Sequence, residues 1–482
     1  MTLAAASFRD PAGSCCQIGQ RIIRTLHGTN AAAFEAFLRT PQCREFVARG
    51  QLVATRRLPD TELAQLAASF PDVSPICNSE AGAVFEHERI PFPSYPHEWS
   101  PEMLWQAGRL TLELARNALK AGYGLKDATP YNVLFRGPTP VFVDVPSFEL
   151  RHPGDPVWRA YGQFVRTFLL PLLVNRCWGV RLADIFTTHR EGLEPQEVYP
   201  WCGLLQRFRP PFLSLVSMPT WLRRKARADG ERLYQPRTLS NPEKARFIVD
   251  SLLAQLERSL IRLKPSARRD SQWSSYMTTH SYTESAFAAK EAFVRQWLEE
   301  FRPARVLDVG ANTGHFSALA ARSEASVVAV DIDPACVGAI WQHAAEQQLD
   351  VLPLVMDLAR PSPALGWDNR ECPSFQDRAR AGFECVLVLA AVHHLLVTER
   401  VPLEEILRFA AKLTTSTLVV EFVAPDDEMF RQLTRGREHL HTGLTEAVFA
   451  KTCAAHFDVV RSLPLPGTHR TLYGLKRRGG IP

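Results

Sequence analysis

The chain has 482 residues, of which 46% are hydrophobic and 22% charged, and its formal net charge is only +5. This composition excludes a largely disordered chain, and the length predicts more than one hydrophobic core. The ten cysteines show no CxxC or Cys-His spacing, so neither a disulfide framework nor a structural metal is expected. We therefore predict two domains and a connector.

Membrane insertion and export are not expected from the sequence. The N-terminus lacks a basic start and a long apolar run, unlike a secretory signal. The most apolar stretch, residues 164–174, contains Arg166 and Pro171 and is too short to span a bilayer. The basic stretch 223–237 is explained by a solvated helix face at least as well as by nucleic acid. We expect a cytoplasmic protein with no membrane partner.

The first half of the chain predicts a small lobe followed by a helical region. Residues 21–27, 51–57 and 84–90 have the pattern of strands, and residues 1–98 are assigned to the small lobe. Ser100 and Pro101 are the N-cap and first-turn residues of a long helix that ends near Lys120. The helical region is assigned to residues 99–263.

A polar cluster follows this helix. Asp127 is followed five residues later by Asn132, and twelve residues after that by Asp144 at the end of an apolar strand. This spacing resembles the catalytic loop and the metal-binding acid of the protein-kinase-like and aminoglycoside-phosphotransferase-like fold. In such enzymes a carboxylate orients the hydroxyl nucleophile, and an Asn and an Asp hold Mg²⁺ on the phosphates. If this half is active, the resemblance implies Mg-ATP, with Asp127 catalytic and Asn132 and Asp144 binding the metal.

The cluster also departs from the kinase pattern. The residues before Asp127 are Gly-Leu-Lys, Asp144 is followed by Val-Pro, and no glycine-rich nucleotide loop is recognisable. A strand lysine for the phosphates is absent, with only Arg56 and Arg57 nearby. Working phosphotransfer, a module that only presents a substrate or partner, and a simple hydrogen-bonded turn all remain open.

A linker and lid are assigned to residues 264–285, and a helix is predicted over residues 287–298. The linker begins with a run rich in Pro, Ser and Arg and ends in an aromatic and polar stretch. Tyr276, Ser281 and Tyr282 are candidates to line a lid over a ligand, and an aromatic helix packed on a sheet is the alternative.

The second half opens on residues 305–333, which combine a strand, a glycine turn, a helix and a second strand. The first strand ends at Asp308, the turn contains Gly310 and Gly314, and the second strand ends at Asp331. Glycine permits both the turn dihedrals and the close approach of a ligand. An acid about 20 residues beyond the first glycine is where a ribose diol would lie, so the spacing indicates an adenosine-bearing ligand.

The residues between the glycines distinguish two ligand classes. Gly310 to Gly314 reads GANTG, without the third glycine of GxGxxG, and Asp308 would repel a pyrophosphate. The pattern resembles motif I of class I S-adenosylmethionine-dependent methyltransferases. This resemblance implies that Asp308, Gly310, Asn312 and Gly314 hold the methionine part and that Asp331 binds the ribose. The alternative is an ordinary Rossmann-type turn.

Further strands are predicted over residues 352–357, 383–390 and 417–423, with a helix near residues 403–412. Residues 457–463 and 470–476 alternate in polarity around a Pro-Gly turn and predict a closing hairpin. The fold class is therefore α/β. We expect a seven-stranded Rossmann-like methyltransferase sheet with a closing antiparallel hairpin over residues 286–478, preceded by an α+β kinase-like domain.

Ligands of open α/β sheets bind at the carboxyl ends of the strands. By resemblance, Asp357 and Leu358 would face the adenine, and the loop from Ala390 would lie beside donor and acceptor; a solvated strand-end acid is the alternative for Asp357. His393 and His394 are candidate bases, because imidazole titrates near neutrality. Packing is the alternative role for this pair.

The positions after the fourth strand also bear on the acceptor. They lack the Asn/Asp-Pro-Pro-aromatic run of nucleic-acid amino methyltransferases and the Pro-Cys pair of pyrimidine C5 enzymes. We therefore expect S-adenosylmethionine-dependent transfer to oxygen or nitrogen of a small molecule. A bifunctional enzyme and a non-catalytic scaffold are the alternatives. The whole chain resembles bacterial methyltransferase-like proteins, some of them linked to nodulation.

Overall fold

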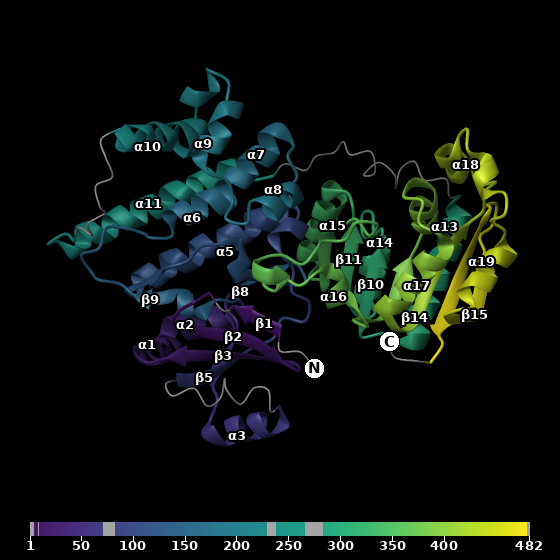
Figure 1. The fold of residues 1–482 in the computed structure, drawn as a ribbon, viewed down its shortest axis with the longest axis horizontal. Coiled ribbons are helices and arrows are strands. Elements are labelled where there is room, and N and C mark those ends of the chain that lie inside the picture. The colour runs from purple at the N-terminus through teal and green to yellow at the C-terminus, as the bar shows by residue number, and fades with distance from the viewer. Residues whose placement is uncertain (1–3, 8, 71–81, 229–237, 266–282, 480–482) are drawn as a thin grey trace. The chain divides into compact units, whose positions relative to one another are not determined.

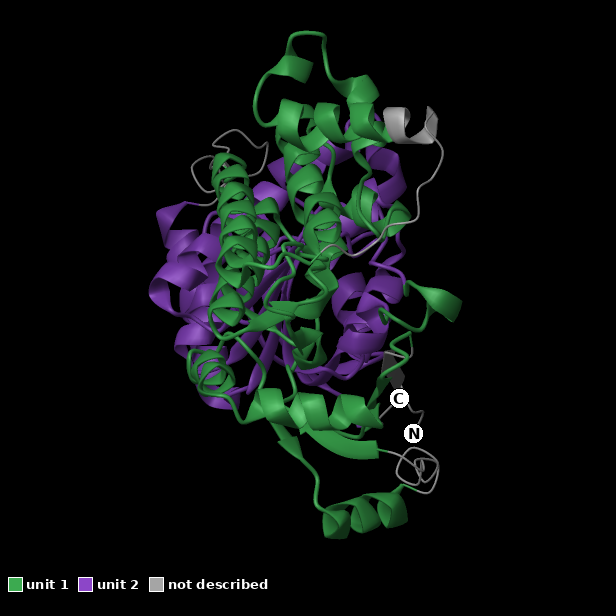
Figure 2. Ribbon diagram, turned by 90° about the vertical axis from the view of Figure 1, so that its left-hand side faces the viewer, with its two compact units in different colours: residues 1–135, 140–265, 364–373 green, residues 136–139, 266–363, 374–482 purple. Residues whose placement is uncertain are grey.

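The computed structural model describes residues 4–7, 9–70, 82–228, 238–265 and 283–479. They form two compact units, coloured separately in Figure 2. Unit 1 comprises residues 1–135, 140–265 and 364–373, and unit 2 comprises residues 136–139, 266–363 and 374–482. The main division between residues 265 and 266 falls within the segment that we assigned as a linker. Tyr276, Ser281 and Tyr282, the candidate lid residues, lie outside the described residues.

Unit 1 begins with a five-stranded antiparallel sheet in the order β1-β2-β3-β5-β4. Its strands are β1 (Ala4–Ser7), β2 (Gly13–Ile18), β3 (Arg21–His27), β4 (Thr55–Arg57) and β5 (Gly82–His87). Helices α1 (Thr29–Leu38) and α2 (Pro41–Ala48) follow β3, and α3 (Asp60–Ser69) follows β4 (Figure 1).

Two strand predictions in this sheet need correction. The run 51–57 contributes only Thr55–Arg57, because Val53 donates its N–H to the Phe142 carbonyl and the Phe142 N–H donates to Gln51. Those backbone groups are therefore paired outside the sheet. The run 84–90 is shifted to Gly82–His87, where β5 pairs with both β3 and β4.

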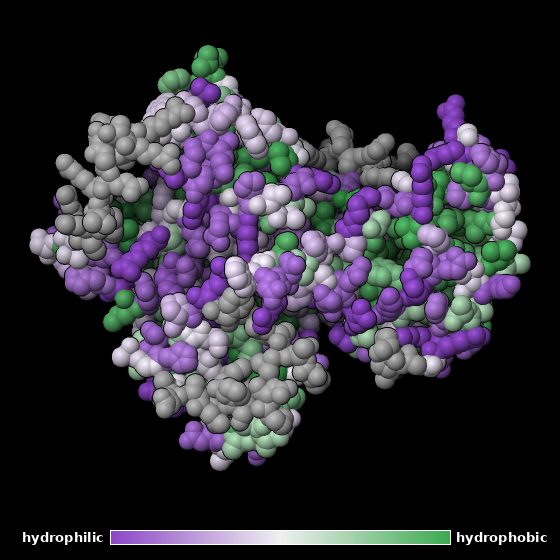
Figure 3. Space-filling view, viewed as in Figure 1, coloured by the Kyte–Doolittle hydropathy of each residue, from purple (hydrophilic) through white to green (hydrophobic). Residues whose placement is uncertain are grey.

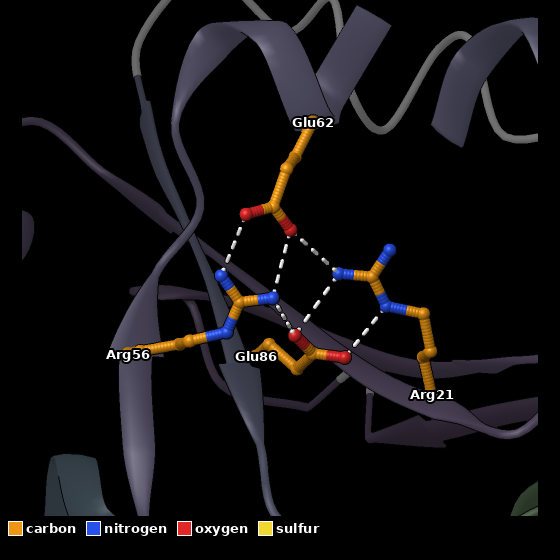
Figure 4. A network of polar contacts seen from close by, with 4 residues as sticks. All are labelled: Arg21, Arg56, Glu62 and Glu86. Atoms are coloured by element: carbon orange, nitrogen blue, oxygen red, sulfur yellow. Dashed lines mark hydrogen bonds and ion pairs between the residues drawn. The ribbon is translucent and has the colours of Figure 1, made fainter. Parts of the chain in front are cut away.

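An ion-pair network joins β3, β4, β5 and α3 (Figure 4). Glu86 on β5 accepts from Arg21 at 2.6 Å and from Arg56 at 2.5 Å, and Arg56 also pairs with Glu62 at 2.7 Å. Both guanidinium groups are part-exposed, so each pair contributes little to stability by itself. Arg56 is thereby engaged with two carboxylates, which does not favour the role of a phosphate-binding cation.

The rest of unit 1 is mainly helical. The predicted long helix is α5 (Pro101–Lys120), and Ser100 accepts a hydrogen bond from the Met103 N–H as its N-cap. It packs against α11, where the Trp105 indole donates to the Leu260 carbonyl at 2.8 Å. The other elements are β6 (Tyr123–Leu125), β7 (Val133–Arg136), β8 (Thr139–Phe142), β9 (Phe148–Leu150), α6 (Tyr161–Phe164), α7 (Leu170–Trp178), α8 (Leu182–Thr188), α9 (Pro195–Val198), α10 (Met218–Ala228) and α11 (Pro242–Arg262).

Unit 2 contains a seven-stranded sheet in the order β12-β11-β10-β13-β14-β16-β15. Its strands are β10 (Arg305–Val309), β11 (Ser326–Asp331), β12 (Val351–Val355), β13 (Phe383–Val388), β14 (Thr414–Val423), β15 (Phe457–Pro464) and β16 (Arg470–Arg477). The first five strands in this order pair in parallel, and β16 pairs antiparallel with both β14 and β15. The predicted sheet with its closing hairpin is confirmed.

Helices pack on the two faces of this sheet, as expected for buried parallel strands. They are α13 (Glu284–Phe301), α14 (His315–Arg322), α15 (Pro334–Gln347), α16 (Phe375–Ala379), α17 (Leu403–Leu413), α18 (Glu428–Thr434) and α19 (Glu446–Cys453). Trp297 of α13 is fully buried against β16, where a Cβ on Gly474 would come within 2.2 Å of its ring.

The predicted run 383–390 is too long, because β13 ends at Val388. Ala390 has φ 54°, in the left-handed region, and a residue in that conformation cannot continue a strand. The chain therefore turns away at the carboxyl edge of the sheet. Neighbouring strands β10, β11 and β12 end at the same edge, which positions the residues that follow them together.

None of the helices in the described ranges is long and apolar enough to cross a membrane. None of the nine cysteines within those ranges forms a disulfide.

Candidate functional site

The glycine turn after β10 is held against the end of β11. The N–H groups of Gly310 and Ala311 both donate to the Val330 carbonyl, at 2.9 and 3.1 Å. Gly310 and Gly314 have φ values of 68° and 82°, which favour glycine. A Cβ on Gly314 would also lie 2.9 Å from Ile340, so this position excludes side chains on steric grounds too.

Asp331, at the end of β11, connects the turn to the next helix. Its carboxylate accepts from the Asn312 N–H at 2.8 Å and from the Asp333 N–H at 2.9 Å. Burial raises its pKa to about 6, although the backbone hydrogen bonds act in the opposite direction. The carboxylate therefore fixes the loop while its remaining lone pairs are suited to accept from hydroxyl groups of a ligand.

Asp308 lies one residue before the end of β10 and is 2% exposed. It accepts a hydrogen bond from the Ser317 hydroxyl at 2.6 Å. Burial raises its pKa to about 6, and the hydrogen bond from Ser317 and the charge of Lys290 only partly offset this effect. A buried acid with this pKa is a favourable neighbour for a bound cation.

These residues border a cavity of about 330 Å³ at the carboxyl edge of the sheet. Among the predicted cofactor residues, its lining includes Asp308, Gly310, Asn312, Asp331, Asp357, Leu358 and Ala390. Gly314 does not line it and instead faces Ile340 from the start of α14. The structure thus brings seven of the eight residues to one cavity, although they are spread over about 80 positions of the sequence.

Asp357 differs from the other two acids of the cavity. Its carboxylate accepts from the Ala359 N–H at 2.9 Å and pairs with Arg360 at 2.8 Å. Arg360 pairs in turn with Glu399, another residue of the lining, at 2.7 Å. Asp357 therefore has the local contacts of a strand-end acid, one of our two interpretations, while still facing the cavity.

The two histidines after β13 lie in different environments. His394 lines the cavity, whereas His393 is 2% exposed and lies among apolar side chains around a void of about 10 Å³. Burial lowers the pKa of both below the usual histidine value, and the positive charge of Arg470 adds to this effect. Both are therefore neutral at pH 7, and only His394 is placed to exchange a proton with a ligand in the cavity.

Lys290 of α13 lines the same cavity and was missed by sequence reasoning. Its ammonium, on a residue 3% exposed, pairs with Glu421 of β14 at 2.6 Å and lies 5.3 Å from the Phe316 ring centroid. Glu421 also faces Arg470, which forms a two-bond contact with Asp427. The sequence signal that could have identified it is the position of this lysine within the apolar stripe of a helix.

In unit 1 the predicted polar cluster has a different environment. Asp144 pairs with Arg24 of β3 at 3.1 Å and accepts a hydrogen bond from Ser147 with its other oxygen. Arg24 is 6% exposed and donates to His87 at 3.0 Å. Sequence reasoning missed Arg24. This residue places a buried cation on β3, whereas only Arg56 and Arg57 of β4 had been considered as strand cations.

These contacts do not fit a Mg²⁺ site well. Both carboxylate oxygens of Asp144 already have partners, one of them a guanidinium that neutralises the charge a cation would need. Asn132 has its amide nitrogen buried without a hydrogen-bond partner. Burial and the nearby Asp144 raise the pKa of Asp127. Within the described ranges, no group of three or more His, Cys, Asp or Glu side chains is arranged to hold a metal.

Comparison with known families agrees with the geometry of unit 2. Residues 279–444 match the family model described as "Methyltransferase domain". The C-terminal region therefore contains a methyltransferase domain, whose seven-stranded sheet has the cavity at its carboxyl edge.

The whole chain is similar to "Nodulation protein NoeA" of Rhizobium meliloti (strain 1021). The two are 29% identical over 478 residues, which is 98% of this chain and 96% of that protein. The expected likeness to nodulation-associated proteins is confirmed.

Two solved structures are similar to part of this chain. One is the N-methyltransferase NodS of Bradyrhizobium japonicum WM9 in complex with S-adenosyl-L-homocysteine, at 12% identity and a TM-score of 0.31, covering 44% of this chain and 100% of that chain. The other is the bifunctional kinase-methyltransferase WbdD, at 15% identity and a TM-score of 0.28, covering 39% of this chain and 38% of that chain.

Proposed function

We propose that unit 2 binds S-adenosylmethionine in the cavity at the carboxyl edge of its sheet and transfers the methyl group to oxygen or nitrogen of a small molecule. The observation that carries the proposal is the convergence of a glycine turn and two buried acids, Asp308 and Asp331, on one cavity of about 330 Å³. A cavity of this size suits a ligand of this class. When bound, S-adenosylmethionine supplies an electrophilic methyl group on a sulfonium centre.

The chain's own residues suit the parts of that donor. Asp331 accepts hydrogen bonds from the ribose hydroxyls, and Asp308 provides negative charge to the cationic end. Gly310 lines the cavity, and a Cβ there would meet the Ala391 side chain at 3.3 Å, so glycine fits this position. Lys290 also lines the cavity, where its side-chain nitrogen lies 2.6 Å from Glu421 and suits the donor's carboxylate.

Methyl transfer needs the acceptor atom in line with the methyl group and free of its proton. Positioning of the two reactants supplies roughly 7 to 11 kcal/mol of such a barrier. We propose His394 as the base, since its neutral imidazole lines the cavity. His393 lies outside that lining and is proposed to pack beneath the loop.

For unit 1 we propose binding of a substrate or partner, not phosphotransfer. Support comes from Arg24, whose guanidinium pairs with Asp144 where a phosphotransferase would need a free metal ligand. Calorimetric titration with Mg-ATP distinguishes the two. The proposal expects no heat of binding with wild type, whereas binding that is lost in Asp144→Ala would contradict it and favour the bifunctional alternative.

The methyltransferase proposal is tested by supplying the full chain and isotopically labelled S-adenosylmethionine to a whole-cell extract that contains both metabolites and nucleic acid. Mass spectrometry should detect a metabolite that gains one labelled methyl group with wild type and not with Asp331→Ala. His394→Gln should form the same product more slowly. Label appearing in nucleic acid, or in no product while the donor binds, would refute the proposed acceptor class.

A further inference from the structure

Unit 1 carries a group of exposed apolar side chains between α9 and the first turns of α10. Leu204 and Leu205 are each 75% exposed, Phe208 is 64% exposed and Leu222 is 63% exposed. Figure 3 shows apolar side chains at this end of the unit, beyond α9 and α10. We call this group the apolar tip; it consists of Trp201, Leu204, Leu205, Phe208, Met218, Trp221 and Leu222.

The apolar tip is held outward by contacts beneath it. The Trp221 indole donates to the Tyr199 hydroxyl at 3.0 Å, and its ring packs against Phe208 with centroids 5.9 Å apart. Arg207 lies over the Tyr199 ring at 4.2 Å and donates to the Cys202 carbonyl at 3.1 Å. The apolar tip therefore belongs to a packed segment, and its leucines are displayed by that packing.

The charged side chains of this segment are basic. Among residues 201–223, whose side chains the structure describes, three are basic and none is Asp or Glu, whereas the whole chain has 56 basic and 51 acidic residues. The basic residues are Arg207, Arg209 and Arg223. Arg209 and Arg223 are exposed, and among the described residues Glu194 lies 3.3 Å from Arg223 and also pairs with Arg166.

We propose that the apolar tip docks on an anionic lipid surface. Projecting leucines and aromatic rings insert at the boundary between headgroups and acyl chains, and the surrounding arginines bind the anionic headgroups. Such a contact is peripheral and needs no spanning helix. No membrane partner was expected from the sequence, because no segment is long and apolar enough to span a bilayer. Peripheral docking through the apolar tip needs no such segment.

Charge and shape favour lipid over other occupants. A second copy of the chain would bring the same positive segment against this one, so the like charges would repel. Nucleic acid would match the arginines but would leave Leu204 and Leu205 in water. A lipid surface satisfies both, because its interior accepts apolar side chains and its headgroups accept the guanidinium groups.

The test is co-sedimentation of the full chain with vesicles of phosphatidylcholine alone or mixed with phosphatidylglycerol. Wild type should sediment with the anionic vesicles only, and less so at high salt. The double variant Leu204→Glu, Leu205→Glu should bind at least roughly tenfold more weakly, because it removes two inserted side chains and adds repulsion. Arg209→Gln should weaken binding about fivefold, since one basic residue near a membrane surface contributes on that scale.

The matched control is Leu150→Glu, at an equally exposed leucine of β9 in the same unit. It should bind vesicles as wild type does, and all variants should keep the circular dichroism spectrum and melting temperature of wild type, which shows that unit 1 is folded. Absence of vesicle binding by wild type, or an equal loss in Leu150→Glu, would overturn the proposal. So would a light-scattering mass that falls from dimer to monomer in the double variant while vesicle binding is unchanged.

Discussion

Asp308→Asn should stabilise unit 2 at neutral pH while weakening donor binding. Asp308 is buried, with a pKa raised from an ordinary value of 3.8 to about 6. In the unfolded chain it ionises first, so the stability gained from burying the neutral acid is present below pH 3.8 and is lost as the pH rises through 6. Asparagine resembles the protonated form and still accepts from Ser317.

The magnitude follows from the two pKa values. A rise in the pKa from 3.8 to about 6 lowers the free energy of unfolding of wild type by about 3 kcal/mol above pH 6, at 1.36 kcal/mol per pH unit. The free energy of unfolding of Asp308→Asn minus that of wild type should therefore rise by roughly 2 kcal/mol between about pH 4.5 and about pH 7.5.

The assay is hydrogen exchange of the β10 amides in urea at both pH values, which reports unit 2 alone. Asp350→Asn, at an exposed position of the same unit, is the matched control. A stability difference between Asp308→Asn and wild type that does not change with pH would refute the reasoning. So would undiminished affinity for S-adenosylmethionine in Asp308→Asn, because the lost charge faces the cationic end of the donor.

Three further variants test other parts of the site. Lys290→Met removes one of the two cations beside the buried Glu421 and should destabilise unit 2 by about 3 to 5 kcal/mol in urea unfolding, and unchanged stability would contradict the importance of this pair. His394→Gln should lower kcat by about 10² to 10⁴ with little change in KM, and an equal effect of His393→Gln would contradict the assignment of the base. Gly314→Ala should destabilise the turn by about 1 to 3 kcal/mol in the same unfolding assay, and no change would contradict the predicted clash with Ile340.

The sheet of unit 2 was predictable because its inner strands are buried on both faces and read as nearly continuous apolar runs. The residues of the cavity were predictable for a related reason, since parallel strands end at one edge and the polar residues beyond them meet there. The error at residues 389–390 arose where local backbone conformation overrode an apolar pattern, with Ala390 in the left-handed region.

Other features depended on contacts between distant residues. Arg24 meets Asp144 across 120 positions of sequence, and Lys290 meets Glu421 across 131. Arg24 by itself resembles an ordinary surface residue, and for both cations only the tertiary structure reveals the buried partner. The short β4 likewise reflects pairing of Gln51 and Val53 with Phe142, which the pattern of residues 51–57 does not encode.

The most direct test of the central claim is calorimetric titration of the full chain with S-adenosylmethionine. We predict saturable binding to wild type with one donor per chain. In Asp331→Ala, affinity should fall at least about tenfold, because hydrogen bonds to a charged group contribute about 1.5 to 3 kcal/mol each. A flat titration of wild type, or equal affinity in the variant, would contradict the account.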